Sequence, residues 1–300
     1  MPHFSRPTSL LTFFLLALIT ASIVACGRDI DDPVGGEISV VTTTYPLTYM
    51  AQRIGGNRVS VTQLVKPGVE AHDFEPAPSD VRTISSADVF IFNHPSFESW
   101  ALNAATASIS GSFSSLITVQ TVVLETAGED HGGQAVNDSI FDPHVWLNPL
   151  KALDQSKSIL AALVAVDPEG SIEYIRNAVA LEAELKGLDH QISTQLAECE
   201  LNSVVVSHLA FGHMAERYGF SQIGLAGLSP EFESGPSHVA NVIKRINDLG
   251  IRHILQEPIV SDRLAKTVAE ETGAQLLTLH PLEVRTADEA SNGTDYITIM

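Results

Sequence analysis

The chain has 300 residues, and 36 acidic against 17 basic residues give it a formal net charge of −19 at pH 7. Hydrophobic residues make up 44% of the sequence, a globular composition with enough length for two lobes that each enclose a core. The acidic balance argues against nucleic acid or an anionic membrane surface as a partner, because binding phosphate requires clustered Lys and Arg.

The N-terminal residues have the pattern of a secretion signal. Arg6 gives a weakly positive start, residues 10–23 are apolar, and small residues come just before Cys26. We therefore predict a signal peptide over residues 1–25. The polar stretch at 26–36 shows no periodicity and is predicted to be a flexible tether.

Val24-Ala25-Cys26 resembles the lipobox of bacterial lipoproteins. This resemblance implies cleavage before Cys26 and acylation of that cysteine. The alternative is an ordinary signal peptide in which Cys26 is incidental. If Cys26 is lipidated, Cys199 is the only remaining thiol and no intramolecular disulfide can form. We expect Cys199 to be a buried helix residue.

Strand and helix patterns alternate from residue 37 onward. The predicted elements, in chain order, are a strand at 38–42, a helix at 45–54, a strand at 59–65, a helix from residue 78, a strand at 88–93, a helix at 97–108 and a strand at 117–124. Such alternation is typical of a parallel α/β sandwich. We predict an N-terminal α/β lobe over residues 37–167.

A long amphipathic stretch follows this first lobe. From Pro168 to about Cys199 apolar residues recur at spacings of three and four without a strand signal, so we predict one linking helix over 168–200. Alternation then resumes, with strands at 204–206, 221–224, 251–256 and 275–279 and helices at 210–218, 239–249 and 264–272. A C-terminal α/β lobe over 201–300 is expected to repeat the first. The predicted fold is two lobes, each with a mostly parallel sheet flanked by helices, joined by one long backbone helix.

Four histidines stand where these elements would bring ligands together. His72 and His144 fall in predicted loops of the first lobe, and His208 and His280 directly follow short apolar strands of the second. Open α/β sheets bind ligands just beyond the carboxyl ends of their strands. A single histidine is more often a hydrogen-bonded structural residue, but four at matching positions favour a metal held between the lobes. Imidazole suits Zn, Cu, Ni and Fe, whereas Mn prefers oxygen, so the pattern favours zinc over manganese.

Four acidic residues are candidates for orienting the imidazoles of these histidines. A ligating histidine usually donates its other N–H to an oxygen atom. The candidates are Asp73, Glu75, Asp142 and Glu257. His213 follows His208 by five residues on a predicted helix, a spacing that turns it to another face, and we expect it to serve packing or the surface.

Several motifs resemble, in the same order, those of the metal-binding proteins of zinc and manganese ABC importers. They are His72-Asp-Phe-Glu-Pro76 with Pro78-Ser-Asp80, Asp142-Pro-His-Val-Trp-Leu-Asn-Pro149, Ser207-His-Leu-Ala-Phe-Gly-His-Met-Ala-Glu-Arg-Tyr-Gly219, Gln256-Glu-Pro258 and Leu279-His-Pro-Leu282. The resemblance runs from about residue 38 to residue 300. It implies two lobes joined by a rigid backbone helix, with a metal held in the cleft by one ligand from each of four loops. Mapped by motif, these ligands are His72, His144, His208 and His280.

The chain departs from the family pattern at the fourth ligand. That position is commonly an aspartate before Pro-Leu, whereas this chain has His280, and Glu283 is an alternative oxygen ligand. At the third position the family's manganese carriers tend to show glutamate and its zinc carriers histidine, so His208 favours zinc.

Two further departures concern a loop and the C-terminus. Zinc importers of this kind often carry a long His-rich loop, but residues 126–140 contain only His131, so we expect a flexible loop with at most a weak capture role. The family usually continues with another helix after a segment like residues 296–300, and we expect that last packing helix to be missing.

The resemblance implies a monomeric, lipid-anchored receptor at the cell surface or in the periplasm. Such a receptor captures Zn²⁺ and passes it to an ABC permease with a cytoplasmic ATPase, and it is not an enzyme. A competing hypothesis is a secreted zinc hydrolase, which needs three protein ligands and an open position for water. Against it, the chain has no His-Glu-x-x-His or Gly-x-Ser-x-Gly motif. A manganese-specific receptor and a surface adhesin are two more hypotheses that the sequence leaves open.

Overall fold

The computed structural model describes residue 1 and residues 37–108, 115–116, 141–230 and 235–300. Several sequence-based predictions therefore lie outside the described residues. They are the signal peptide, Cys26 and its tether, the strand at 117–124, and the loop at 126–140 that contains His131. Residues Glu37–Met300 form one compact unit.

Four of the described strands form the first sheet. They are β1 (Ile38–Thr42), β2 (Val59–Gln63), β3 (Val89–Ile91) and β4 (Ser115–Leu116). Their order across the sheet is β2-β1-β3-β4, and each neighbouring pair is parallel. Val40 of β1 lies in register with Val61 of β2 on one side and with Val89 of β3 on the other. Parallel sheets are covered on both faces, which explains why the central strand β3 is fully buried.

Helices cover the two faces of this sheet. They are α2 (Tyr45–Gly55), α3 (Pro78–Ser85), α4 (Ser99–Ser108) and α5 (Pro149–Val166). Successive strand residues point to opposite faces. Val40 therefore packs with residues of α2 and α5 in one hydrophobic cluster, whereas Val41 packs with residues of α3 and α4 in another. We call this sheet and its helices the first lobe.

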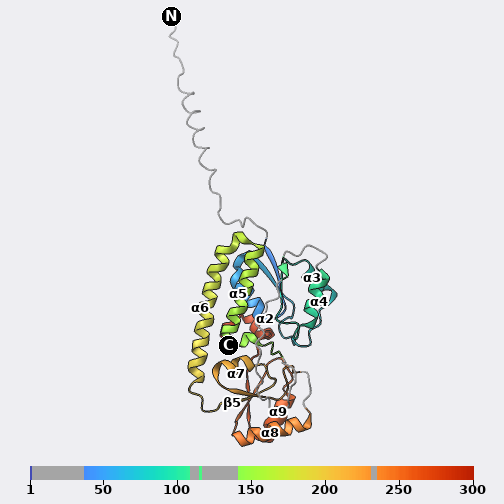
Figure 1. Cartoon of the computed structure of the whole chain (residues 1–300), viewed down its shortest axis with the longest axis vertical. Helices are drawn as coiled ribbons and strands as arrows, with labels where there is room; N and C mark the ends of the chain where they lie inside the picture. The colour runs from blue at the N-terminus through green and yellow to red at the C-terminus, as the bar shows by residue number, and fades with distance from the viewer. Residues whose placement is uncertain (2–36, 109–114, 117–140, 231–234) are drawn as a thin grey trace. The chain divides into compact units, whose positions relative to one another are not determined.

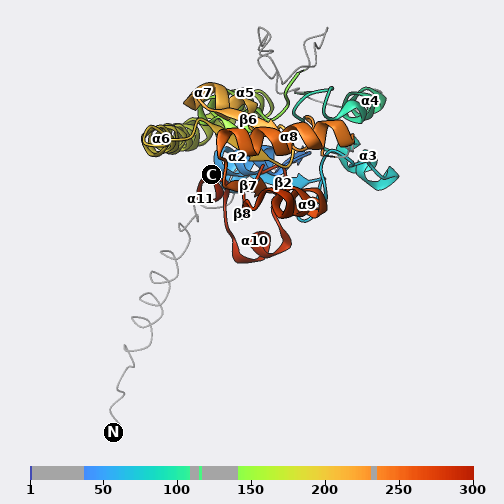
Figure 2. The ribbon, with the colours of Figure 1, turned by 90° about the horizontal axis from the view of Figure 1, so that it is seen from below.

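The second sheet repeats the strand order of the first. Its strands are β5 (Ser203–Val206), β6 (Ser221–Gly224), β7 (His253–Gln256) and β8 (Gln275–Thr278), in the order β6-β5-β7-β8 with parallel pairing throughout. The helices in this part of the chain are α7 (Gly212–Tyr218), α8 (Pro236–Leu249), α9 (Arg263–Thr272), α10 (Ala287–Asn292) and α11 (Tyr296–Ile299), of which α11 packs against α2 and α6. Residues of α8 and α9 pack on one face of the sheet, and Figure 2 shows α8 in front of the strands. This sheet and its helices form the second lobe.

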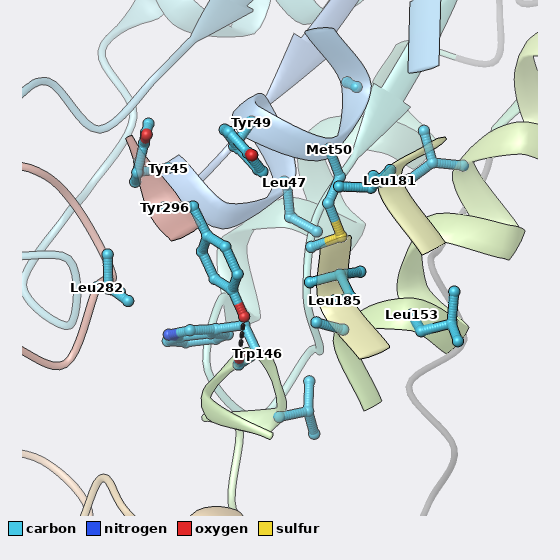
Figure 3. Close-up of a cluster of buried hydrophobic side chains, with 14 of the residues drawn as sticks. Tyr45, Leu47, Tyr49, Met50, Trp146, Leu153, Leu181, Leu185, Leu282 and Tyr296 are labelled. Atoms are coloured by element: carbon cyan, nitrogen blue, oxygen red, sulfur yellow. Dashed lines mark hydrogen bonds between the residues drawn. The ribbon is translucent and has the colours of Figure 1, made fainter. Parts of the chain in front are cut away.

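The long helix α6 (Ser171–Leu196) contacts helices of both lobes. It lies beside α5 and reaches to the level of α7 (Figure 1). Its buried residues Leu181, Leu185, Leu188 and Ile192 are spaced by three and four positions, as the sequence predicts. Figure 3 shows Leu181 and Leu185 in a cluster with Met50 of α2 and Leu153 of α5. The predicted fold of two parallel α/β lobes with a long helix is thus confirmed.

The structure also adds elements that were not predicted. In α5, Gln155 and Ser156 are buried and interrupt the apolar pattern by which an amphipathic helix is recognised. Helices α10 and α11 are six and four residues long, too short to give a periodic signal. The expectation for Cys199 is wrong, because this residue follows the end of α6 and is exposed.

Membrane-spanning helices were searched for among the described residues. None of the helices there has both the length and the apolar composition needed to cross a membrane.

We predict that α6 stabilises the unit through its buried face alone. Leu181 is fully buried and Val179, two residues away, is 60% exposed. Leu181→Ala should lower the free energy of unfolding by about 3 kcal/mol, since it removes buried methyl groups and leaves a cavity. Val179→Ala should change it by less than about 0.5 kcal/mol. Urea denaturation of protein lacking residues 1–26 measures both, and equal effects would contradict the packing of α6.

Candidate metal centre

Four side chains converge at one point between the two sheets' loops. His72, His144, His208 and Glu283 each offer one donor atom, and these atoms all lie within 4.8 Å of one another. His144 and His208 are completely buried, and the side chains of His72 and Glu283 are 8% and 6% exposed. Three neutral imidazoles and one carboxylate in this arrangement could hold a metal ion.

The topology explains why residues so far apart in sequence meet. His208 lies two residues after the end of β5, and Glu283 lies in the loop after β8. His72 lies in the loop after β2, and His144 immediately precedes the 3₁₀ turn η2 (Val145–Leu147). The carboxyl ends of parallel strands open onto one edge of each sheet, where open α/β folds bind ligands. Two donors therefore come from each lobe.

The spacing of the donor atoms suits a small tetrahedral ion. The Oε1 atom of Glu283 lies 3.1 Å from Nε2 of His72, 3.2 Å from Nε2 of His144 and 3.5 Å from Nε2 of His208. The Nε2 atoms of His144 and His208 are 3.2 Å apart. Tetrahedral ligands at zinc–nitrogen distances of about 2.05 Å are separated by about 3.3 Å. Four of the six edges of such a tetrahedron thus have suitable lengths.

Two carboxylates orient the imidazoles from behind. The Nδ1–H of His144 donates to Oδ1 of Asp142 at 2.7 Å, and the Nδ1–H of His208 donates to Oε1 of Glu257 at 2.6 Å. In the neutral form that binds a metal the proton stays on Nδ1, and each ring then presents the lone pair of Nε2 to the centre. The structure therefore places Asp142 and Glu257 where the sequence predicted orienting acceptors.

The other two predicted acceptors are placed differently. Asp73 and Glu75 are exposed, and within the described ranges no hydrogen bond joins either of them to an imidazole of the group. Sequence reasoning missed Glu70, whose Oε1 accepts the backbone N–H of His72 at 2.8 Å. A carboxylate two residues before a ligand is the local signal that could have identified it, because this spacing favours such a turn.

In this group, the cost of burying each charge is offset by hydrogen bonds between the carboxylates and the imidazoles. Burial alone would raise the pKa of Glu283, but hydrogen bonds from the three imidazoles hold it well below its usual range. Burial alone would lower the pKa of His208, but the carboxylates of Glu257 and Glu283 outweigh it and raise that pKa to about 10. The pKa of His144 is likewise raised, because its hydrogen bonds to carboxylates outweigh its burial. Without metal, the group is a buried carboxylate that attracts protons to its imidazoles.

His280, predicted at the fourth ligand position, lies outside this group. Its Nδ1 accepts the backbone N–H of Leu282 at 2.9 Å, and its Nε2 lies 3.1 Å from Oε2 of Glu289 at the start of α10. Both ring nitrogens are therefore used in holding the turn between β8 and α10. His280 thus lies apart from the three clustered histidines, and Glu283, the alternative oxygen ligand, is the fourth member of the group.

The backbone explains this exchange. Leu282 has φ of 61°, a left-handed conformation that costs a non-glycine residue about 1–3 kcal/mol. Contacts on either side hold it there: the indole N–H of Trp146 donates to the carbonyl of Pro281 at 2.7 Å, and the backbone N–H of Tyr45 donates to that of Glu283 at 2.8 Å. The side chain of the next residue, Glu283, reaches the three imidazoles.

Apolar rings surround the donors. The ring of Phe97 meets that of His72 edge-on with centroids 4.7 Å apart, and Trp146 lies 5.4 Å from the ring of His144. Such walls lower the local dielectric and strengthen interactions between a cation and its donors.

The family model and the related sequences that match this chain agree on one protein family. Residues 40–300 match the family model described as ZnuA, the periplasmic component A of the zinc-uptake complex. The high-affinity zinc uptake system protein ZnuA of Bacillus subtilis is 31% identical over 296 residues, which cover 96% of this chain and 93% of that protein. The zinc-binding protein AdcA of Streptococcus pyogenes serotype M3 is 32% identical over 279 residues, which cover 88% of this chain and 54% of that protein. The chain thus spans about half the length of the AdcA relatives that it matches.

A solved structure from the same group of zinc-binding proteins is also similar to this chain. The Zn(II)-bound ZnuA-like domain of Streptococcus pneumoniae AdcA aligns with a TM-score of 0.75 at 29% sequence identity, covering 88% of this chain and 95% of that domain.

We predict that Glu283, and not His280, contributes to metal affinity. Glu283→Ala removes a donor at the centre of the group, so zinc affinity should fall by about 100-fold or more, beyond the loss typical of an outer partner. His280→Ala should change it by less than about threefold. Glu75→Ala, which removes an exposed carboxylate, is the matched control. Competition with a chromogenic chelator measures all three, and a larger loss in His280→Ala than in Glu283→Ala would contradict the site.

Proposed function

The chain belongs to the ZnuA family of zinc-uptake components, and from this premise we propose that it is an extracytoplasmic receptor for Zn²⁺. It captures the ion with His72, His144, His208 and Glu283 and delivers it to an ABC import permease driven by a cytoplasmic ATPase. The convergence of these four buried donors within 4.8 Å of one another is the observation that carries the proposal.

The donor set favours zinc among the common divalent ions. Three imidazole nitrogens and one carboxylate oxygen match the borderline character of Zn²⁺, whereas Mn²⁺ and Mg²⁺ prefer sites richer in oxygen. Four of the six donor spacings, at 3.1–3.5 Å, also suit a small tetrahedral ion. A manganese-specific receptor is therefore less consistent with the geometry.

Closure of the group supports a receptor over a hydrolase. A catalytic zinc keeps three protein ligands and a fourth position open to water. Here the Oε1 atom of Glu283 lies within 3.5 Å of all three imidazole Nε2 atoms, so a protein oxygen takes the fourth position. Transport proteins need reversible capture and not an activated water.

The location follows from the N-terminal sequence. The lipobox-like Val24-Ala25-Cys26 supports acylation of Cys26, and residues 26–36 would tether the folded unit to the outer side of the cytoplasmic membrane. A protein anchored in this way meets its permease by diffusion in two dimensions. Monomeric action is part of the same proposal, since both lobes of one chain supply the donors.

Metal titration tests the function directly. Metal-free protein lacking residues 1–26 should bind one Zn²⁺ tightly in calorimetry and should bind Mn²⁺ at least about 100-fold more weakly, as donor preference requires. His208→Ala should abolish tight zinc binding, whereas His253→Ala, at an exposed position of β7, should not. A preference for Mn²⁺ would require a different ligand set.

Zinc binding should release protons. The pKa of His208 in the metal-free group is raised to about 10, so this imidazole is protonated at pH 7 and must lose its proton to bind zinc. Affinity should therefore rise about tenfold per pH unit for each proton released, and fall as the pH is lowered from 8 to 6. Calorimetry in buffers of different ionisation enthalpy counts the protons, and a pH-independent affinity would contradict this electrostatic description.

A further inference from the structure

His213 of α7 is a buried histidine that the metal group does not use. It is 4% exposed, and its two ring nitrogens face opposite polar partners. The Nε2–H donates to the backbone carbonyl of Asp142 at 2.9 Å, and Nδ1 lies 2.7 Å from the Nζ of Lys151. A lysine ammonium only donates and a carbonyl only accepts, so His213 is a neutral ring with its proton on Nε2. Burial also lowers the pKa of His213, which agrees with the neutral form.

These contacts join the two lobes. Asp142 and Lys151 belong to the first lobe, in the loop before η2 and in α5, and His213 belongs to the second. The backbone carbonyl of His213 also accepts the side-chain N–H of Asn148 at 3.3 Å. The chain around Asp142 is thus held by α7 of the opposite lobe.

The neighbouring residue, Gly212, accommodates the carboxylate of Asp142. A Cβ atom at Gly212 would lie 2.5 Å from Oδ2 of Asp142, closer than any real contact. The other oxygen, Oδ1, accepts the Nδ1–H of His144 at 2.7 Å and its backbone N–H at 3.0 Å. Two consecutive residues of α7 therefore determine where both the carbonyl and the carboxylate of Asp142 lie.

We infer that Gly212 and His213 are positioning residues for metal capture: they hold Asp142, and through it they orient the imidazole of His144. The second lobe thereby sets the orientation of a donor that the first lobe contributes. This inference rests on the proposed function, because it assigns a role within the same zinc site. It also gives a reason for a histidine five residues after His208 that is not itself a ligand.

Substitutions at His213 separate positioning from packing. His213→Leu removes both hydrogen bonds while filling a similar volume, and it should weaken zinc binding by about 10- to 100-fold, the range typical for partners that orient a ligand. His213→Gln keeps an amide N–H able to reach the Asp142 carbonyl and should restore part of this loss. The exposed His253→Leu is the control and should stay within about threefold of wild type.

A double-mutant cycle tests whether His213 acts through Asp142. Asp142→Ala alone should weaken zinc binding, and adding His213→Leu should cause little further loss, because the carboxylate through which His213 acts is already absent. Independent structural damage would instead give multiplicative losses. Gly212→Ala offers a second route, since its methyl group displaces Oδ2 of Asp142 without removing a hydrogen bond.

The measurements use the full chain purified in detergent, with zinc affinity determined by competition against a chelator and the visible spectrum of bound Co²⁺ as the report on donor geometry. We expect both His213→Leu and Gly212→Ala to weaken zinc binding and to shift the Co²⁺ bands. If wild type binds zinc but both variants keep its affinity and spectrum, or if the losses multiply in the cycle, the inference is overturned and the proposed function stands. Failure of wild type to bind zinc would overturn the proposed function and the inference together.

Discussion

The contacts of the buried Glu283 carboxylate with three imidazoles join the two lobes at the metal centre. An isolated buried carboxylate is strongly unfavourable, and removal of its partners would leave an uncompensated charge. Here Oε1 has imidazole nitrogens from both lobes within 3.5 Å. A divalent cation at this point would neutralise the carboxylate and replace the protons that the metal-free imidazoles attract. The same buried negative charge that requires compensation would therefore also favour the binding of a cation.

Buried aromatic residues hold the turn that carries this carboxylate. Tyr296 of α11 donates its hydroxyl hydrogen to the backbone carbonyl of Trp146, a bond drawn in Figure 3. The indole of Trp146 in turn holds the carbonyl of Pro281, next to the left-handed residue Leu282. The strained turn that aims Glu283 is therefore anchored in the largest hydrophobic cluster, which includes residues of α2, α5 and α6. Strain of this kind persists only where surrounding contacts over-determine it.

The orientation of the imidazoles shows how the lobes cooperate. Glu257 and His208 both lie in the second lobe, so that pair is set within one sheet's loops. Asp142 and His144 both come from the first lobe, but Asp142 is held by His213 across the interface. The orientation of His144 therefore depends on a contact between the lobes, whereas the acceptor of His208 lies within its own lobe. The contacts of α6 with helices of both lobes also join the lobes.

Local sequence determined much of this protein. Periodicity and β-branched runs were sufficient to predict the two parallel sheets and the long helix, because those patterns depend on near neighbours in the chain. The strand end before His208, the predicted loops of His72 and His144, and the family motifs likewise predicted that these three histidines lie at one place, and the structure brings them together. The fourth donor was decided only by tertiary structure. His280 follows a strand as a ligand should, yet Glu289 and the Leu282 N–H occupy its ring, and contacts from Trp146 and Tyr45 turn Glu283 inward instead. Trp146 and Tyr45 lie in distant parts of the chain. A backbone conformation that depends on such long-range contacts produces no periodic pattern in the sequence, so the position of Glu283 could not be predicted from it.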